Sequence, residues 1–310
     1  EMSASLVGSE MCIRDRSIII CSVSPLRLLD VKQNIKETIG NEVLYEIIAV
    51  DNREKKWPIA KAYNWGAQAA QYPYLFFVHE DIKFHSTGWG TFIEQKLAEP
   101  DCGVIGFAGS KVKLNSYSGW FQNNDWNYWY YCQGDSEGRS AYCVRGVYLD
   151  KPFEEVVALD GFAMFVRKDV WNENQFDEKN LTGFHCYDLD FSMQIARKYK
   201  NYVCCSFVLI EHLSPGNFNN KWYTDTIRLH VNKWNSFLPL KTNDIELTKE
   251  CIKKDGERAA YQFLFAILRS DCTNADKAKV LKDFWRRPLS WEHLVHCFSC
   301  TLKYLRTIRL

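Results

Sequence analysis

Short apolar runs alternate with amphipathic segments along the first hundred residues of the chain. The runs at residues 17–23 (SIIICSV), 45–50 (YEIIAV) and 74–78 are rich in β-branched and aromatic residues and too short for helices, so we expect buried strands. Apolar residues at helical spacing fill the intervals, over residues 26–39 and over the alanine-rich segment 59–70. This alternation is typical of an α/β fold with a parallel sheet flanked by helices.

Two of the expected strands end abruptly in acidic residues. Asp51 follows the second run, and the third leads into His79-Glu80-Asp81. Ligands bind at the carboxyl ends of the strands in open α/β sheets. We therefore expect Asp51 to hydrogen-bond a base or ribose. At His79-Glu80-Asp81 we expect a divalent cation that also binds a diphosphate. The alternative is a strand that simply ends in solvated charge.

The order of these motifs resembles the nucleotide-binding half of GT-A glycosyltransferases, family 2-like, and within them the StrF-like branch. The resemblance covers about residues 17–234 and rests on SIIICSV, EIIAVDN, AYNWG and FFVHED in succession. The family's Ala-Arg-Asn-x-Gly helix is matched with Tyr63 in place of Arg, and its DxD metal motif with His79 in place of the first Asp. We therefore favour Asp81 over His79 as a metal ligand.

Three later positions match the family as well. The apolar run at residues 157–166 is broken by Asp160-Gly161, where the family has a turn near the donor sugar. Tyr187-Asp188-Leu189-Asp190 resembles its Glu-Asp-x-Asp-Leu segment, which makes Asp188 the catalytic base; the alternative is a plain helix N-cap. His212 follows an expected strand at residues 202–210 and matches a histidine that completes the metal site, although it is equally expected as a packed core residue.

The resemblance implies a metal-dependent, inverting glycosyltransferase of bacterial polysaccharide biosynthesis. Mn²⁺ or Mg²⁺ would be held by Asp81 with His212 and His79, and the nucleoside of a nucleotide-diphosphate sugar by Asp51 and Asn64, with Ser22 nearby. The acceptor would be a saccharide or a lipid-linked saccharide. Two alternatives remain: a nucleotidyltransferase on a similar sheet, and a catalytically inactive sugar-binding relative. No glycine-rich dinucleotide motif or P-loop occurs, which excludes dehydrogenases and P-loop kinases of the usual kind.

Residues 17–240 are expected to form the GT-A domain, with an acceptor-side insertion at residues 111–155. The insertion interleaves Trp and Tyr with Asn, Gly and Asp and shows no sustained period, so we expect an irregular loop. Its Trp120 and Trp126 would stack on sugar rings, unless these rings simply pack inward.

Composition and net charge limit the possible partners and the cellular compartment of the protein. The net charge of +1 gives no global field that would favour nucleic acid. The 12 cysteines are scattered, and Cys21, Cys204 and Cys205 lie in apolar runs. We expect free thiols in a reducing compartment, and so a cytoplasmic protein. No apolar run approaches the ~18 residues needed to span a bilayer.

The two ends of the chain differ from its middle. Residues 1–16 resemble a translated sequencing adapter, and we expect them to lie outside the fold. Residues 241–310 are expected to form a helical extension. Its last helix has an apolar stripe of Trp291, Leu294, Val295, Phe298, Leu302 and Leu305. We expect this stripe to pack on the catalytic domain, with peripheral membrane contact as the alternative. His293, Cys297 and Cys300 on the opposite side suggest a zinc site, although they are also ordinary packing residues.

Overall fold

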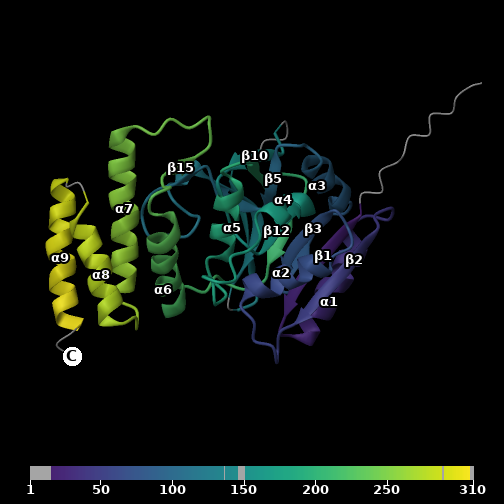
Figure 1. Cartoon of the computed structure of the whole chain (residues 1–310), viewed down its shortest axis with the longest axis horizontal. Coiled ribbons are helices and arrows are strands. Elements are labelled where there is room, and N and C mark those ends of the chain that lie inside the picture. The colour runs from purple at the N-terminus through teal and green to yellow at the C-terminus, as the bar shows by residue number, and fades with distance from the viewer. Residues whose placement is uncertain (1–14, 136, 146–150, 288–289, 308–310) are drawn as a thin grey trace, which may run out of the picture.

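A seven-stranded mixed sheet forms the centre of the protein in the computed structural model, which describes residues 15–135, 137–145, 151–287 and 290–307 (Figure 1). Its strands lie in the order β10 (Phe153–Val156), β13 (Lys200–Cys204), β5 (Cys102–Gly106), β12 (Ala163–Arg167), β3 (Tyr74–His79), β1 (Arg16–Ser22) and β2 (Tyr45–Asp51). β1 runs parallel to both β2 and β3, as expected from the sequence, whereas β12 is antiparallel to its neighbours β3 and β5. The predicted α/β fold is confirmed.

Helices cover both faces of this sheet because its strands are apolar on both sides. Ile18 and Ile20 of β1 point to a core shared with α1 (Pro25–Thr38) and α3 (Trp89–Leu97). Ile19 points the other way, to a core shared with α2 (Ile59–Ala69), α4 (Lys168–Glu173) and α5 (Tyr187–Ile195). The two-residue period of a strand thus divides one continuous apolar run between two cores.

A second sheet packs across the carboxyl ends of the central strands. It contains β11 (Ala158–Leu159), β6 (Ala108–Ser110), β8 (Asn127–Gly134), β14 (Ile210–His212) and β4 (Ile82–Phe84), with β9 (Ser140–Arg145) paired to β8. Two expectations are corrected here. The insertion expected to be irregular contains the hairpin β8–β9, because β8 is half-buried along most of its length and so shows no polar–apolar alternation. The strand expected at residues 202–210 is two strands, β13 and β14, in different sheets.

Four helices form a separate core at one end of the long axis of the molecule (Figure 1). They are α6 (Asn220–Leu229), which continues into a π-helical segment His230–Trp234, α7 (Lys249–Ile267), α8 (Asn274–Trp285) and α9 (Trp291–Thr307). The short strand β15 (Leu240–Lys241) pairs with β7 (Val112–Lys113) and ties this helical end to the rest. The three helices expected after Asp244 are present. α6 is an addition that the sequence pattern did not indicate.

The orientation of α9 is opposite to the one we expected. His293, Cys297 and Cys300 are buried against α7 and α8, whereas the apolar stripe faces outward. His293 Nε2 lies 2.9 Å from the carbonyl oxygen of Phe284, so this histidine already has a partner. Within the described ranges, the ligand atoms of these three residues do not form a metal-binding group. The zinc hypothesis is therefore wrong.

The amino-terminal boundary also needs a correction of one residue. β1 begins at Arg16, which is buried and whose guanidinium forms an ion pair with Glu94 on α3. Arg16 thus belongs to the fold, although we expected it in the excluded segment. Residues 1–14 of that segment lie outside the described residues.

Candidate active site

Strand register gathers the first polar groups at one edge of the central sheet. Ser22 lies opposite Asp51, and Cys21 opposite His79, because β1 is parallel to both neighbours. Asp160 and Gly161 join β11 to β12 and reach the same edge, since Ala163 pairs with Val78 at the end of β3.

Glu80 organises the turn after β1, a role that the sequence pattern did not suggest. Its Oε2 accepts hydrogen bonds from Ser22 Oγ (2.6 Å) and from the backbone N–H groups of Val23 (3.1 Å) and Ser24 (3.0 Å). The buried carboxylate therefore fixes the turn that leads into α1. The only sign of this role in the sequence was that Glu80 lies between His79 and Asp81, two residues of metal-ligand type.

His79, Asp81 and His212 form the one group of potential metal ligands found among the described residues. Their ligand atoms all lie within 4.8 Å of one another. Asp81 Oδ1 is 3.8 Å from His79 Nδ1 and 3.7 Å from His212 Nε2. Burial raises the pKa of Asp81, but the two histidines and a hydrogen bond from Ser214 outweigh this effect and lower it overall. The carboxylate is therefore ionised and ready to bind a cation.

A hydrogen-bond chain fixes the tautomer of His79. The hydroxyl of Tyr187 donates its single proton to the carbonyl oxygen of Gly161 (2.9 Å) and lies 2.7 Å from His79 Nε2. Nε2 must then carry the imidazole proton, which leaves the lone pair on Nδ1, the atom that faces Asp81. Burial, together with the nearby His212, lowers the pKa of His79 to about 4, so the ring stays neutral. A neutral imidazole with a free Nδ1 fits a metal ligand.

The three departures from the family pattern lie together. Tyr63 contacts the ring of Tyr187 edge-on at 5.7 Å between centroids, and Tyr187 in turn contacts His79. Tyr63 is also buried between Phe77 and Phe176. A neutral aromatic cluster thus stands where the family pattern has an Arg, an Asp and a Glu. The three changes together remove one positive and two negative charges, so this part of the site carries one negative charge fewer than the family pattern.

Asp188 lies in the first turn of α5, across Gly161 from the metal-ligand group. The N-cap of the helix is Cys186, so the simple capping alternative for Asp188 does not hold. A Cβ on residue 161 would lie 2.7 Å from Asp188 Cβ, so this close approach requires glycine. Burial and the neighbouring Asp160 raise the pKa of Asp188 to about 7, although backbone hydrogen bonds from Leu189 and Gly161 oppose the shift.

A cavity of about 840 Å³ adjoins these groups. Its lining includes His79, Asp160, Asp188 and His212, together with aromatic side chains from the insertion and from α6 and α7. Trp120 lies in this wall, and its Nε1 donates a hydrogen bond to Asp160 Oδ2 (2.7 Å). Trp126 does not: it is buried in a satellite core beside Val112 and Leu114, so its predicted contact with an acceptor is wrong.

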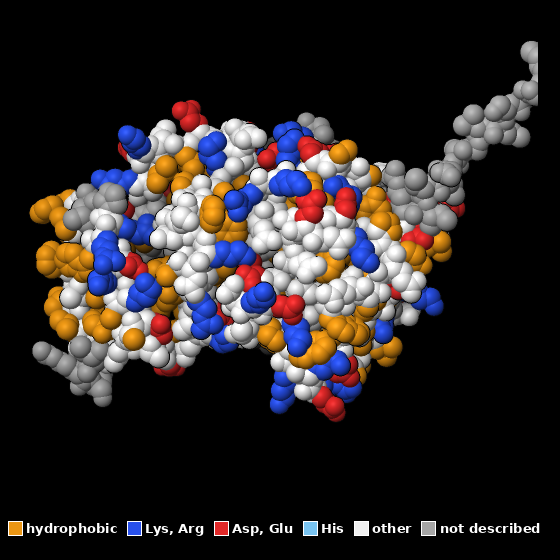
Figure 2. All heavy atoms as spheres, viewed as in Figure 1, with side chains coloured by type: hydrophobic (Ala, Val, Ile, Leu, Met, Phe, Trp, Pro, Cys, Tyr) orange, Lys and Arg blue, Asp and Glu red, His pale blue; other side chains and the backbone are white. Residues whose placement is uncertain are grey.

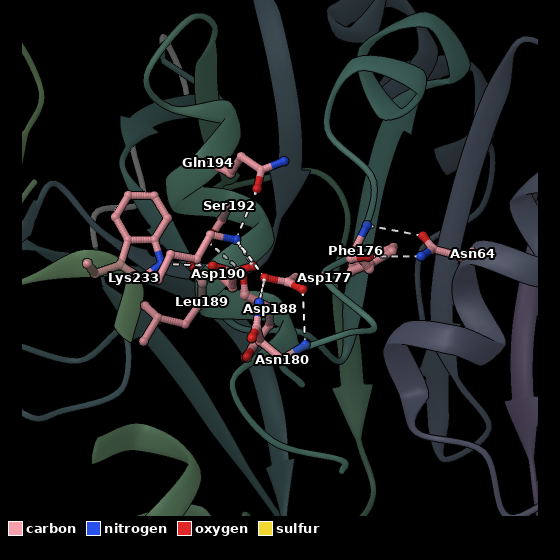
Figure 3. Close-up of polar contacts among 11 residues, drawn as sticks. Asn64, Phe176, Asp177, Asn180, Asp188, Leu189, Asp190, Ser192, Gln194 and Lys233 are labelled. Carbon is pink, nitrogen blue, oxygen red and sulfur yellow. Dashed lines mark hydrogen bonds and ion pairs between the residues drawn. The ribbon is translucent and has the colours of Figure 1, made fainter. Parts of the chain in front are cut away.

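The two residues predicted to bind the nucleoside, Asp51 and Asn64, have contrasting surroundings. Asp51 is exposed at the sheet edge and forms an ion pair with Arg53 (2.6 Å), whose hydrogen bonds lower the pKa of Asp51 to about 2. Asn64 is buried, and its amide bonds both the N–H and the carbonyl of Phe176 (3.1 and 2.8 Å), as Figure 3 shows. Because both the oxygen and the nitrogen of this amide are already hydrogen-bonded, the prediction that Asn64 binds the nucleoside is wrong. Asn64 instead links α2 to the segment before α5.

A buried ionic network connects α5 to the π-helical segment that follows α6. Asp190 Oδ2 lies 2.7 Å from Lys233 Nζ, and Asp190 Oδ1 accepts a hydrogen bond from Trp234 Nε1 (2.7 Å) (Figure 3). The sequence pattern did not indicate this pairing of Asp190. Its partner is 43 positions away, on the π-helical segment after α6.

The mixed sheet flanked by helices has the α/β architecture that the sequence predicted, with a ligand group at the end of its central strand and a carboxylate beside a cavity. Residues 17–237 match the Glycosyltransferase like family, and the chain belongs to that family. The predicted relationship to glycosyltransferases is thereby confirmed at the level of the family.

Solved structures give distant likenesses. The crystal structure of GalNAc-T7 with UDP, GalNAc and Mn²⁺ is 10% identical, with a TM-score of 0.47, over 73% of this chain and 50% of that one. The chain thus spans about half the length of that protein. The structure of A197 from STIV is 15% identical, with a TM-score of 0.37, over 64% of this chain and 85% of that one. Comparison with curated proteins finds no match. Within the described residues, no helix has the length and apolar character required to cross a membrane.

Proposed function

We propose that the protein transfers a sugar from a nucleotide-diphosphate donor to an acceptor hydroxyl by a single, inverting displacement that depends on a divalent metal. The observation that carries this proposal is the position of Asp188. It lies beside Gly161, whose carbonyl is linked through Tyr187 to His79 of the metal-ligand group. A base and a site for the diphosphate thus flank one cavity.

Asp188 would take the proton from the acceptor hydroxyl as that oxygen attacks the anomeric carbon. A base is most effective when its pKa lies near the working pH, and the pKa of Asp188, about 7, meets this condition. The bond from the anomeric carbon to the diphosphate breaks on the opposite face of the sugar, which inverts the configuration. Asp160 and Gly161 would lie beside the donor sugar, and Ser22 and Asp51 beside the nucleoside.

The donor set fits a metal ion. Asp81 offers an ionised carboxylate, and His79 offers a neutral Nδ1 beside His212 Nε2. Imidazole ligands suit Mn²⁺ better than Mg²⁺, which prefers oxygen, so we favour Mn²⁺. When bound, the ion would neutralise charge that develops on the departing diphosphate.

The acceptor is proposed to be a saccharide or a lipid-linked saccharide in bacterial polysaccharide synthesis. Aromatic side chains around the cavity, such as Trp120, Phe184 and Trp222, offer faces for a sugar ring or for an apolar group. We place the reaction in the reducing cytoplasm because Cys21, Cys204 and Cys205 are free thiols.

Turnover of a panel of nucleotide sugars in Mn²⁺ tests the proposal, with nucleoside diphosphate and pyrophosphate measured separately. Nucleoside diphosphate is the expected product; pyrophosphate would identify a nucleotidyltransferase. Asp188→Asn should lower turnover roughly 10²–10⁴-fold and leave donor affinity nearly unchanged. Asp81→Ala should abolish the Mn²⁺-dependent part of nucleotide binding while the protein stays folded.

Asp169→Asn is the matched control, since Asp169 is exposed and is not among the residues that line the cavity. If Asp188→Asn retains turnover within a few-fold of the wild type, Asp188 is not the base. If no nucleotide binds in Mn²⁺, the alternative of an inactive relative gains support over the enzyme.

A further inference from the structure

The outer face of α9 departs from the usual burial of the apolar side of an amphipathic helix. Trp291, Val295, Phe298, Leu302 and Leu305 have exposed fractions of 82%, 57%, 62%, 61% and 40%. They recur at helical spacing and so form one continuous apolar stripe. Figure 2 shows hydrophobic side chains along the outer edge of the molecule at this end.

The stripe cannot turn inward without unpacking the helical end. The opposite side of α9 carries His293, Cys297 and Cys300, which are buried against α7 and α8. Trp285 of α8 donates to the hydroxyl of Thr301 (3.1 Å) and lies against Phe298 at 5.3 Å between ring centroids. The rotation of α9 is therefore fixed by its own core, and the apolar face is left for an external partner.

Charges around the stripe are mainly of one sign. From residue 277 to the end, the sequence has eight Lys and Arg residues but only two acidic residues, Asp283 and Glu292. Among the basic residues, Lys277 is buried, whereas Lys282 and Arg286 on α8 and Arg306 on α9 are exposed; Figure 2 shows basic side chains next to hydrophobic ones at this end. Asp283 is already engaged with Lys279 (3.3 Å) and Arg286 (3.5 Å).

We propose that this face of α9 is a docking surface for an anionic lipid bilayer. Trp, Phe and Leu on one side of a helix, flanked by Lys and Arg, are what an interfacial helix needs to lie in the plane of a membrane. A second copy of the chain fits less well, because a twofold contact along α9 would bring the same basic residues toward one another. Docking by α9 leaves the cavity open, since the cavity is lined by the other side of α7, at Ala259, Gln262, Phe263 and Ala266.

Sedimentation of the full chain with vesicles tests this surface. The wild type should sediment with vesicles of phosphatidylglycerol and phosphatidylcholine at low salt, and much less with pure phosphatidylcholine. Phe298→Ser/Leu302→Ser should weaken the partition about tenfold or more. Arg286→Gln/Arg306→Gln should weaken it about fivefold per charge at low salt and have little effect at high salt.

Leu29→Ser/Leu44→Ser is the matched control, because these leucines are similarly exposed (65% and 61%) but lie at the other end of the molecule. It should bind vesicles like the wild type. Equal binding to neutral and anionic vesicles, absence of binding, or an equal loss in the control would overturn the proposal. Sedimentation velocity without lipid tests whether the stripe binds a second copy of the chain instead. A wild-type dimer that becomes a monomer in Phe298→Ser/Leu302→Ser would assign the stripe to that second copy and overturn the proposal.

Discussion

Burial moves the pKa values of His79 and Asp188 in opposite directions, and each shift serves the proposed reaction. A buried imidazole loses its proton more readily, so His79 remains a neutral ligand. A buried carboxyl group holds its proton more tightly, and the nearby Asp160 adds to this effect. Asp188 is consequently a stronger base than an exposed aspartate.

The pH dependence of turnover should report this shift. Only the carboxylate form of Asp188 can accept a proton, so kcat/KM should fall as the pH drops below about 7. Asp160→Asn removes the neighbouring negative charge and should move this acid limb to lower pH. An acid limb that stays in place in Asp160→Asn would contradict the assignment of Asp188 as the titrating base.

The raised pKa of Asp188 also makes the stability of the protein depend on pH. The native state binds the proton of Asp188 more tightly than the unfolded chain, so this group favours the fold below the ordinary pKa of an aspartate, about 3.9. That contribution is lost as the pH rises toward 7. Asp188→Asn should therefore raise Tm at pH 7.5 relative to the wild type, with no gain at pH 4. Equal changes at both pH values would show that the effect is not electrostatic.

Tyr187→Phe tests the hydrogen-bond chain that orients His79. Without the hydroxyl, Nε2 loses its acceptor and the ring is free to adopt the other tautomer. Mn²⁺ affinity, measured by calorimetry in the presence of UDP, should fall roughly 10–100-fold. Tyr199→Phe is the control, since the Tyr199 hydroxyl donates a hydrogen bond to Glu173 on the surface (3.0 Å). Unchanged affinity in Tyr187→Phe would exclude His79 Nδ1 from the ligand set.

At the scale of elements, α5 depends on a charge pair supplied by the segment after α6. Asp190 is 1% exposed, and Lys233 and Trp234 are its partners in the structure (Figure 3). Burial raises the pKa of Asp190, and Lys233 acts against this shift. The pair holds the first turns of the helix that carries Asp188.

Lys233→Met should destabilise the protein by roughly 3–5 kcal/mol at pH 7, because it leaves a buried carboxylate without its cation. The loss should be smaller at lower pH, because burial raises the pKa of Asp190 and favours its neutral form. Adding Asp190→Asn should recover most of the stability. Lys198→Met removes an exposed partner of Glu173 and serves as a control with little expected effect. Denaturant unfolding of the wild type and the three variants measures these changes in stability. A loss that does not depend on pH would contradict the electrostatic account.

At the scale of the whole molecule, the helical end supplies part of the proposed active-site cavity. Ala259, Gln262, Phe263 and Ala266 of α7 line it, opposite the residues from the central sheet. The carboxyl-terminal helices are therefore expected to influence which acceptors bind, in addition to the proposed contact with lipid.

Ala266→Phe should raise the KM for the acceptor about tenfold or more and leave the KM for the donor unchanged, because the larger side chain fills the acceptor side of the cavity. Ala266→Ser, which adds little volume, is the control. A matching rise in the donor KM would indicate that the cavity wall at α7 belongs to the donor instead.

The central sheet and its polar edge were predictable from sequence because both depend on local pattern. Apolar runs of strand length specify β1, β2 and β3, and the abrupt change to His79 and Asp81 marks where β3 ends. The helix that begins near Asp188 follows from the same kind of signal. These features require only the periods of strands and helices, and the fact that parallel strands end at one edge.

Contacts between distant segments were decided by the tertiary structure alone. His212 reaches Asp81 because β14 pairs with β4, and no local pattern reports a pairing across 130 positions. Asn64 and Trp126 carry polar or aromatic groups suited to a site, yet packing turned both inward. The α9 stripe is exposed for a reason that the sequence does not contain. The amphipathic pattern defines which residues share a face of the helix. Only the packing of the opposite face against α7 and α8 determined that the apolar stripe remains uncovered.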